Sequence, residues 1–395
     1  MQTHSRLHYM DNLRALLMIL GVFFHVALAY SPLVHSVWLT ADKVNSPWVD
    51  YLLNFLHMFR MPLFFTVAGF FAALLVQRRG LGGMLKNRVV RVLVPFVLFW
   101  PLIVAAIMLP IGWALENVHN LSPILTLVAS YPDAPPPPPS TTHLWFLYYL
   151  MFFYILAWVI KAIIPVTVKE KILELHPVAA LGLLPLLLIP GLSMTTVPIP
   201  APESFIPQLW AFGFHGLFFA WGYLLFSSFK WVDYFRRYWL LLVLASVALF
   251  IPLQYLYPRQ VDFNYSSPPW PTRMILIIGT AYISVLMSVA GLAFAQKVLD
   301  KRNIIMGYLS DSSYWIYIVH LPIVFAIQYC LLDQEGGLLF KYSVSVVLTF
   351  VVCLASYFIL VRWTPLGWLL NGKRPVRGVE QQASTSGDAA QHSPS

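Results

Sequence analysis

The sequence predicts an all-α integral membrane protein, built as a bundle of about ten transmembrane helices with both termini in the cytoplasm. Of the 395 residues, 59% are hydrophobic and only 10% are charged, whereas a soluble protein carries roughly 25% charged residues. Mean hydropathy is +0.72. So few charges cannot cover a surface that faces water on all sides, and long apolar runs separated by basic connections recur along the chain.

Ten runs are candidates for membrane-spanning helices, because each holds roughly 17–25 mostly apolar residues or comes close to that length. They cover 12–30, 50–76, 92–113, 144–164, 177–191, 205–228, 238–257, 273–296, 313–332 and 338–361. The run at 177–191 is short and contains two internal prolines, which makes it the weakest of the ten.

The distribution of lysine and arginine supports this count. With the N-terminus in the cytoplasm, 20 of the 25 basic residues fall on the cytoplasmic side, as the positive-inside rule requires. The others are Lys43, Arg60, Arg259, Arg273 and Lys341. An alternative reading makes residues 15–29 the core of a signal peptide. Cleavage and loss of this segment would disturb the charge pattern, so we interpret the segment as part of the first transmembrane helix.

Residues 1–377 are expected to form one transmembrane domain, with a proline-rich outer loop at 131–140 acting as a stiff spacer. Residues 378–395 are polar and predict a disordered cytoplasmic tail. The basic residues occur in short clusters between apolar runs. This pattern suits the lipid bilayer as a partner and gives no indication of nucleic-acid binding.

The two cysteines, Cys330 and Cys353, lie in apolar runs, so neither a disulfide framework nor a metal site is indicated. No dinucleotide-binding, phosphate-loop or zinc-protease motif is found in the chain.

Ionisable side chains inside the apolar runs are the candidate functional residues, because they are costly in a membrane. His25 follows Arg14 by eleven residues, which is about three turns and roughly 16 Å, so both project from nearly the same side of the first helix. Asp11 is expected to be a helix N-cap or an i, i+3 partner of Arg14. His57 and Arg60 are neighbours on the second helix at a depth similar to that of His25.

Further candidates come from later runs. Arg88 and Arg91 are one turn apart at the cytoplasmic edge, where with Arg14 they would form a basic cluster suited to phosphate groups. His143 and Trp145 open the fourth run and are expected near the outer entrance. The ninth run contributes polar and aromatic side chains, namely Ser313, Tyr314, Tyr317 and His320.

Most of these residues also have a purely structural explanation. Arg14 can extend its charge to the interface, and Arg88 and Arg91 can serve only to orient the chain. Trp145, Tyr314 and Tyr317 can be belt or packing aromatics, and His143 and His320 can be packing histidines. His25 is the hardest to explain in this way, since a lipid-facing helix has no use for an imidazole at that depth.

These residues fall within motifs that resemble the membrane-bound acyltransferase 3 family. Arg14 and His25 form its R-x10-H pair. The other pieces follow in family order: DNLRALL at 11–17, FRMPLFFTVAGFF at 59–71, RxxR at 88–91, HLWFL at 143–147 and SYWIYIVHLPI at 313–323. Within the family, FHVALAYS and NGKRPV are most similar to members associated with succinylation of osmoregulated periplasmic glucans.

The resemblance implies a multi-pass protein of the cell inner membrane that transfers an acyl group from cytoplasmic acyl-CoA to a carbohydrate hydroxyl. It implies that His25 is catalytic, as general base or acyl carrier, with Arg14 and Asp11 beside it. Succinyl-CoA or acetyl-CoA would be a substrate and no cofactor would be bound permanently. A periplasmic glucan or another glycan is the implied acceptor, and other glucan biosynthesis proteins are the implied protein partners.

Roles for the remaining candidates combine this resemblance with their expected positions. His57 and Arg60 would bind the oxyanion or the acyl group. The CoA moiety would contact Arg88, Arg91, Ser313, Tyr314, Tyr317 and His320, and the acceptor would contact His143 and Trp145. Two other functions stay open: O-acetylation of O-antigen, peptidoglycan or another exported glycan, and non-enzymatic transport along a polar intramembrane path.

Overall fold

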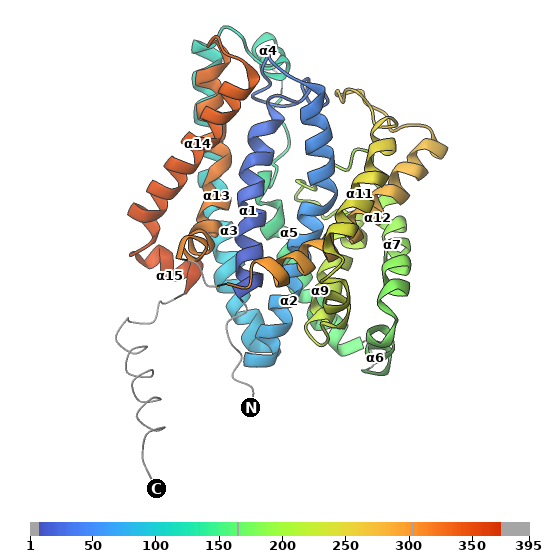
Figure 1. The fold of residues 1–395 in the computed structure, drawn as a ribbon. Coiled ribbons are helices and arrows are strands. Elements are labelled where there is room, and N and C mark those ends of the chain that lie inside the picture. Colours follow the sequence, from blue (N-terminus) through green and yellow to red (C-terminus); the bar gives the residue numbers. More distant parts are fainter. Residues whose placement is uncertain (1–7, 134, 164–165, 302–303, 373–395) are drawn as a thin grey trace.

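The computed structural model describes residues 8–133, 135–163, 166–301 and 304–372, and these residues form an all-helical bundle (Figure 1). No β-strand occurs among them, apart from one isolated antiparallel bridge between Ser140 and Ser204. The predicted all-α fold is therefore confirmed. The expected tail at 378–395 lies outside the described residues.

Six helical stretches of the described chain are long and apolar enough to cross a membrane. They are His8–Leu28, Pro47–Asn117, Thr142–Val159, Trp270–Val298, Ile304–Leu332 and Leu338–Val361. Three shorter apolar helical stretches accompany them: Pro177–Ser193, Leu209–Leu225 and Trp239–Gln254. Each of the ten predicted runs overlaps one of these nine stretches, including the weak run at 177–191.

The individual helices divide these stretches as follows. The long ones are α1 (His8–Leu28), α2 (Pro47–Arg88), α3 (Val94–Asn117), α5 (Trp145–Ile163), α7 (Pro177–Ser193), α11 (Trp239–Gln254), α12 (Trp270–Val298), α13 (Ile304–Leu332) and α14 (Leu338–Ser356). The short ones are α4 (Pro123–Ser130), α6 (Val166–Glu174), α8 (Leu209–Ala211), α9 (Leu217–Leu225), α10 (Lys230–Phe235) and α15 (Pro365–Asn371). Brief 3₁₀ or π turns are η1 (Val89–Leu93), η2 (Thr142–Leu144), η3 (Phe212–Gly216) and η4 (Tyr357–Val361).

The connection between the second and third predicted runs differs from the expectation of a loop. Helical structure continues from Pro47 to Asn117, and the chain changes direction at Gly80, whose φ is +68° and ψ 176°. A positive φ is readily adopted by glycine, which has no Cβ. Arg78 and Arg79 directly precede this turn, so it brings several arginines to one end of the bundle.

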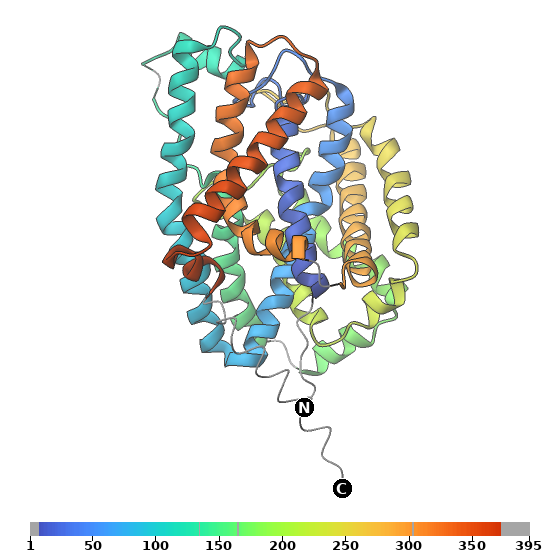
Figure 2. The same cartoon turned by 60° about the vertical axis from the view of Figure 1, so that its left-hand side comes forward.

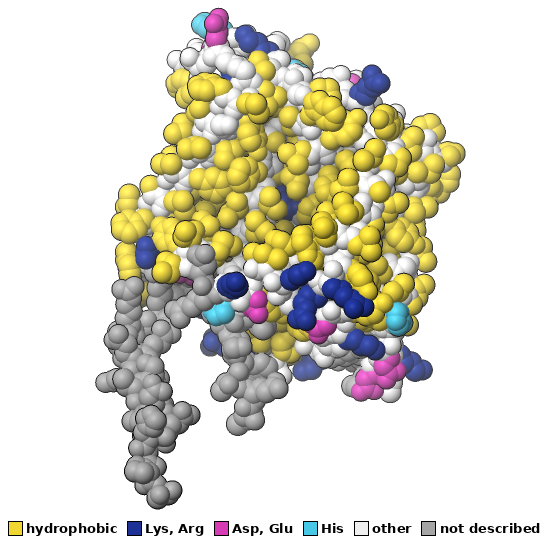
Figure 3. All heavy atoms as spheres, in the orientation of Figure 1, with side chains coloured by type: hydrophobic (Ala, Val, Ile, Leu, Met, Phe, Trp, Pro, Cys, Tyr) yellow, Lys and Arg dark blue, Asp and Glu magenta, His cyan; other side chains and the backbone are white. Residues whose placement is uncertain are grey.

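Helix α1 is central to the bundle and packs against α2, α12, α13 and α14 (Figures 1 and 2). The end at which α1 begins also contains the C-terminal part of α2, η1 and α15, and we call it the basic end. The opposite end contains α4 and the connection from α1 to α2. Figure 3 shows a broad hydrophobic band across the middle of the visible face, with most of the visible Lys and Arg side chains below it at the basic end.

Helices α2 and α9 approach most closely through two glycines. A Cβ on Gly222 would overlap the backbone of Thr66, and a Cβ on Gly69 would overlap the backbone of Phe219. Small residues permit such close contact between helices within a membrane. This contact fixes α2, and with it Arg60, against the second half of the chain.

Helix α5 and the segment α8–η3–α9 begin part-way along the length of the bundle and not at its opposite end. The His143 ring contacts the carbonyl of Ile318, 14 residues and therefore roughly 21 Å before the end of α13. The stretches that lead into the two helices contact each other, since the Thr141 N–H donates to the Glu203 carbonyl at 2.7 Å. The proline-rich loop therefore runs along the surface of the bundle, since its described residues from 131 to 139 are exposed, and the chain becomes buried at Thr141.

A buried ion pair joins the connection after α1 to the start of α14. Lys341 Nζ lies 2.8 Å from Asp42 Oδ2, and the two side chains are 0% and 2% exposed. The Val44 N–H donates to the other carboxylate oxygen of Asp42. This pair links α14 to the connection after α1 at the opposite end of the bundle.

Candidate functional site

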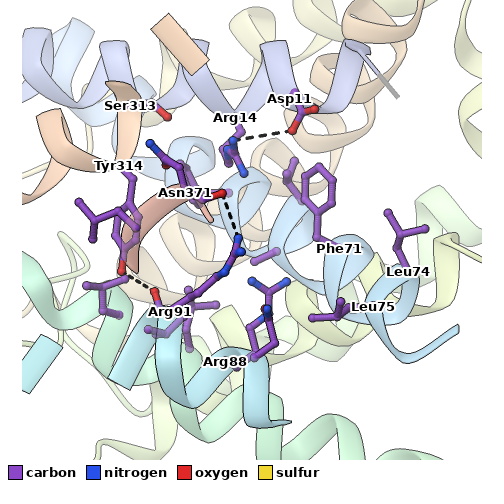
Figure 4. Close-up of a pocket in the computed structure, with 18 of the residues that line it drawn as sticks. Asp11, Arg14, Phe71, Leu74, Leu75, Arg88, Arg91, Ser313, Tyr314 and Asn371 are labelled. Atoms are coloured by element: carbon purple, nitrogen blue, oxygen red, sulfur yellow. Dashed lines mark hydrogen bonds and ion pairs between the residues drawn. The ribbon is translucent and has the colours of Figure 1, made fainter. Parts of the chain in front are cut away.

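A cavity of about 410 Å³ opens at the basic end between α1, α2, α5, α13 and α15 (Figure 4). Its polar lining consists of five arginines, two aspartates and a few hydroxyl and amide side chains. These are Arg14, Arg78, Arg79, Arg88, Arg91, Asp11, Asp311, Ser310, Ser313, Tyr154, Tyr314, Asn87 and Asn371. An excess of guanidinium groups in a recess of this size suits a ligand with several phosphate groups. We call it the basic cavity.

Protein contacts hold several of these arginines in place. Arg14 lies 3.7 Å from Asp11 and 3.3 Å from the Ser310 hydroxyl. Arg91 donates to the Asn371 carbonyl at 3.2 Å, which ties η1 to α15. The Arg88 guanidinium lies over the Tyr154 ring at 5.0 Å from its centroid. The predicted contact between Asp11 and Arg14 is thus present.

A second, smaller cavity of about 40 Å³ lies further into the bundle and contains the His25 side chain. Its other lining residues with polar side-chain atoms are Arg60, His143, Trp145, Tyr317 and His320. Met18, Phe64 and Phe146 line both this histidine cavity and the basic cavity. The two cavities are therefore neighbours, separated by three flexible or rotatable apolar side chains.

Two further histidines, His143 and His320, line the histidine cavity together with His25. His25 Nδ1 lies 2.9 Å from His320 Nε2. The rings of His320 and His143 are 5.1 Å apart, and His143 Nε2 lies 3.0 Å from the Ile318 carbonyl. His143 and Trp145, predicted near the outer entrance, lie instead at the depth of His25, because their helix begins inside the bundle.

Arg60 introduces a buried positive charge into the histidine cavity. Its side chain is 7% exposed, and its guanidinium carbon lies 4.4 Å from the centroid of the Phe24 ring. No carboxylate of the described chain forms an ion pair with it, and its Nε lacks a hydrogen-bond partner there. A buried cation without a protein counter-ion is costly and is well placed to bind an anionic group.

His57 does not line either cavity. Its Nε2 lies 2.8 Å from the Ile199 carbonyl, and its ring stacks on Phe24 at 5.7 Å. The sequence placed His57 and Arg60 together as ligands of the reacting group. The structure places only Arg60 beside His25, with His57 beyond the Phe24 ring.

The hydroxyl-bearing candidates of α13 contact backbone carbonyls. Ser313 donates to Ser310, Tyr314 donates to Arg91 and Tyr317 donates to His143. Ser313 and Tyr314 line the basic cavity, whereas Tyr317 and His320 line the histidine cavity. The predicted CoA-binding set therefore divides between the two cavities, with His320 beside His25.

Sequence reasoning missed seven polar residues of the basic cavity, namely Arg78, Arg79, Asn87, Tyr154, Ser310, Asp311 and Asn371. The charge pattern explains Arg78 and Arg79 only as determinants of topology, although an Arg-Arg pair directly before a glycine at a helix end is a usable signal. Asn371 carries no such signal, because only the folded chain brings α15 against η1. Its side-chain amide also donates to the Asp311 carbonyl at 2.8 Å.

Comparison with known families identifies this chain. The profile of a family described as an acyltransferase domain, of the acyltransferase 3 type, matches residues 7–360. The chain belongs to the acyltransferase 3 family. The matched region includes all three helices that supply Arg14, Arg60 and His320, so the predicted family is confirmed.

Curated relatives of this chain have names from glucan biosynthesis. The chain is 34% identical over 126 residues to glucans biosynthesis protein C of Salmonella paratyphi B, Salmonella heidelberg and Salmonella enteritidis. The matched stretch covers 32% of this chain and 32% of each relative, so the chain spans about a third of the length of the curated relatives it matches. No solved structure matches the chain.

Proposed function

We propose that this protein is an acyl-CoA-dependent O-acyltransferase that transfers an acyl group, with succinyl as the preferred one, to hydroxyls of a periplasmic glucan. The observation that carries the proposal is the placement of the two cavities in line along α1. Arginines of the basic cavity suit the phosphates of a nucleotide donor, and His25 lies one cavity further in, with Met18, Phe64 and Phe146 between them.

In the proposed topology the basic end faces the cytoplasm of the cell and the bundle crosses the inner membrane ten times. Pro47–Asn117 would supply two crossings divided at Gly80, and the three shorter apolar stretches would complete the count. The non-helical residues before α5 and before α8 would form the outer part of those two crossings. The concentration of arginine and lysine at the basic end supports this orientation through the positive-inside rule. Acyl-CoA would then enter from the side on which it is made.

The proposed reaction is a direct acyl transfer. The sugar hydroxyl oxygen attacks the thioester carbonyl, a C–O bond forms and the C–S bond breaks. His25 removes the hydroxyl proton, and the proton passes to the departing thiolate of CoA. Neutral imidazole is suited to this role, since its ordinary pKa near 6.5 permits both steps at physiological pH.

Arg60 supports the choice of succinyl. A succinyl group ends in a carboxylate, and Arg60 offers a buried guanidinium in the cavity of His25 with no protein counter-ion in the described chain. Pairing with that carboxylate would remove the cost of the unpaired buried charge. An acetyl group leaves Arg60 unpaired.

The test is release of CoA by the purified protein from labelled succinyl-CoA, measured with and without an added periplasmic glucan and repeated with acetyl-CoA. We expect release that requires the glucan and is faster with the succinyl donor. Arg60→Gln should lower the rate with succinyl-CoA more than that with acetyl-CoA. Binding of acyl-CoA that does not depend on the glucan and releases no CoA would indicate a transporter. Equal rates with succinyl-CoA and acetyl-CoA would contradict the role of Arg60.

A further inference from the structure

The His320 ring is held in one orientation by its own helix. Its Nδ1 lies 3.0 Å from the Ile316 carbonyl and 2.8 Å from the Tyr317 carbonyl, and its Nε2 lies 2.9 Å from His25 Nδ1. The His320 side chain is 2% exposed. Both of its ring nitrogens are therefore engaged with protein atoms.

These contacts determine where the protons lie. Carbonyl oxygens only accept hydrogen bonds, so His320 Nδ1 must carry a proton. No carboxylate lines the histidine cavity, and Arg60 already brings a positive charge to it, so a second buried cation at His320 is disfavoured. In neutral His320 the Nε2 atom has a lone pair and accepts, which requires His25 to donate through Nδ1–H.

We propose that His320 is a positioning residue that holds His25 in the Nδ1–H tautomer and directs the unprotonated Nε2 of His25 toward the reacting hydroxyl. The inference rests on the proposed acyl transfer and names the atom that performs its proton step. When Nε2 takes the hydroxyl proton, the Nδ1–H of the resulting imidazolium continues to donate to His320. In a Ser-His-Asp triad a carboxylate holds the histidine in this way, whereas here a neutral imidazole does.

Two amide substitutions separate this role from simple packing. In His320→Gln the amide oxygen reaches roughly the place of Nε2 and preserves an acceptor for His25. In His320→Asn the shorter amide reaches only the place of Nδ1, so the contacts with the α13 carbonyls survive but the acceptor is lost. We expect kcat to fall about 100-fold or more in His320→Asn and less than about 10-fold in His320→Gln, with the KM for succinyl-CoA changed less than about threefold.

His176→Asn is the matched control, because His176 caps α7 outside both cavities and asparagine is also a good N-cap. Its kcat should equal that of the native protein. Equal kcat values for His320→Asn and His320→Gln would overturn the proposal, as would a loss expressed in KM alone.

The tautomer can be read directly, which keeps the inference testable if the variants fold poorly. Nitrogen-15 NMR of histidine-labelled native protein, compared with His25→Ala, should show a His25 signal with protonated Nδ1 and unprotonated Nε2. The opposite tautomer would refute the positioning role. This measurement is independent of catalysis, so a protein that shows the expected tautomer but releases no CoA would contradict the proposed function alone.

Discussion

Replacing Lys341 with methionine should lower the free energy of unfolding by about 3–5 kcal/mol. Lys341 Nζ and Asp42 Oδ2 are 2.8 Å apart and both side chains are fully or almost fully buried. At an effective dielectric constant of about 20, the lost attraction is roughly 6 kcal/mol. Relief of the lysine desolvation cost offsets part of this, while the carboxylate remains buried with only the Val44 N–H on its other oxygen.

The assay is unfolding by SDS in mixed micelles, followed by tryptophan fluorescence. The double variant Asp42→Asn/Lys341→Met is the decisive comparison, because it removes both charges at once. Breaking one partner of a buried pair is costly, whereas replacing both is often nearly neutral. The double variant should therefore be more stable than Lys341→Met alone. A Lys341→Met protein within about 0.5 kcal/mol of the native one, or a double variant less stable than both single variants, would refute the reasoning.

Three further outcomes are expected. Gly222→Ala should destabilise the α2–α9 contact by about 1–3 kcal/mol or more in the same SDS assay, whereas Gly182→Ala, with nothing within 4 Å of the new methyl group, should not. Arg88→Gln should raise the KM for acyl-CoA about 10-fold or more through loss of a charged phosphate contact, with Arg237→Gln, outside the basic cavity, as the unaffected control. Hydrogen bonds from the α3–α4 connection hold the pKa of Asp333 below its ordinary value. That contact should therefore stabilise the fold above the ordinary aspartate pKa and be lost as pH falls through the lowered one, a pH dependence that Asp333→Asn should lack.

Much of the helical fold could be predicted from the sequence because lipid imposes a simple length rule. Every predicted run overlaps an observed helix, since about 20 apolar residues in a row have few alternatives to a helix. The depth at which helices begin was harder to predict. The length of its apolar run predicts a helix that crosses the whole bilayer and therefore a position near the surface for His143. Contacts with α13 and with the residues around Glu203 instead place His143 at the depth of His25.

The candidate site was only partly predictable for a related reason. Spacing along one helix placed Arg14 and His25 on the same side, and these residues line adjoining cavities. Spacing carries no information on which helices meet, so the contact between His25 and His320, 295 residues apart in the sequence, could not be derived. Asn371 escaped notice for the same reason. The family resemblance indicates the candidate residues of α13 but does not predict which of the two cavities each residue lines.

Transfer across a sealed membrane is the decisive measurement of whether His25 joins a cytoplasmic acyl donor to a periplasmic acceptor. Inverted inner-membrane vesicles containing the protein would be loaded with unlabelled periplasmic glucan and supplied with labelled succinyl-CoA on the outside, which corresponds to the cytoplasm. We expect labelled glucan within the lumen with the native protein and none with His25→Ala present at the same level. Labelling at the native rate by His25→Ala, or labelling only when donor and glucan share one compartment, would contradict this expectation.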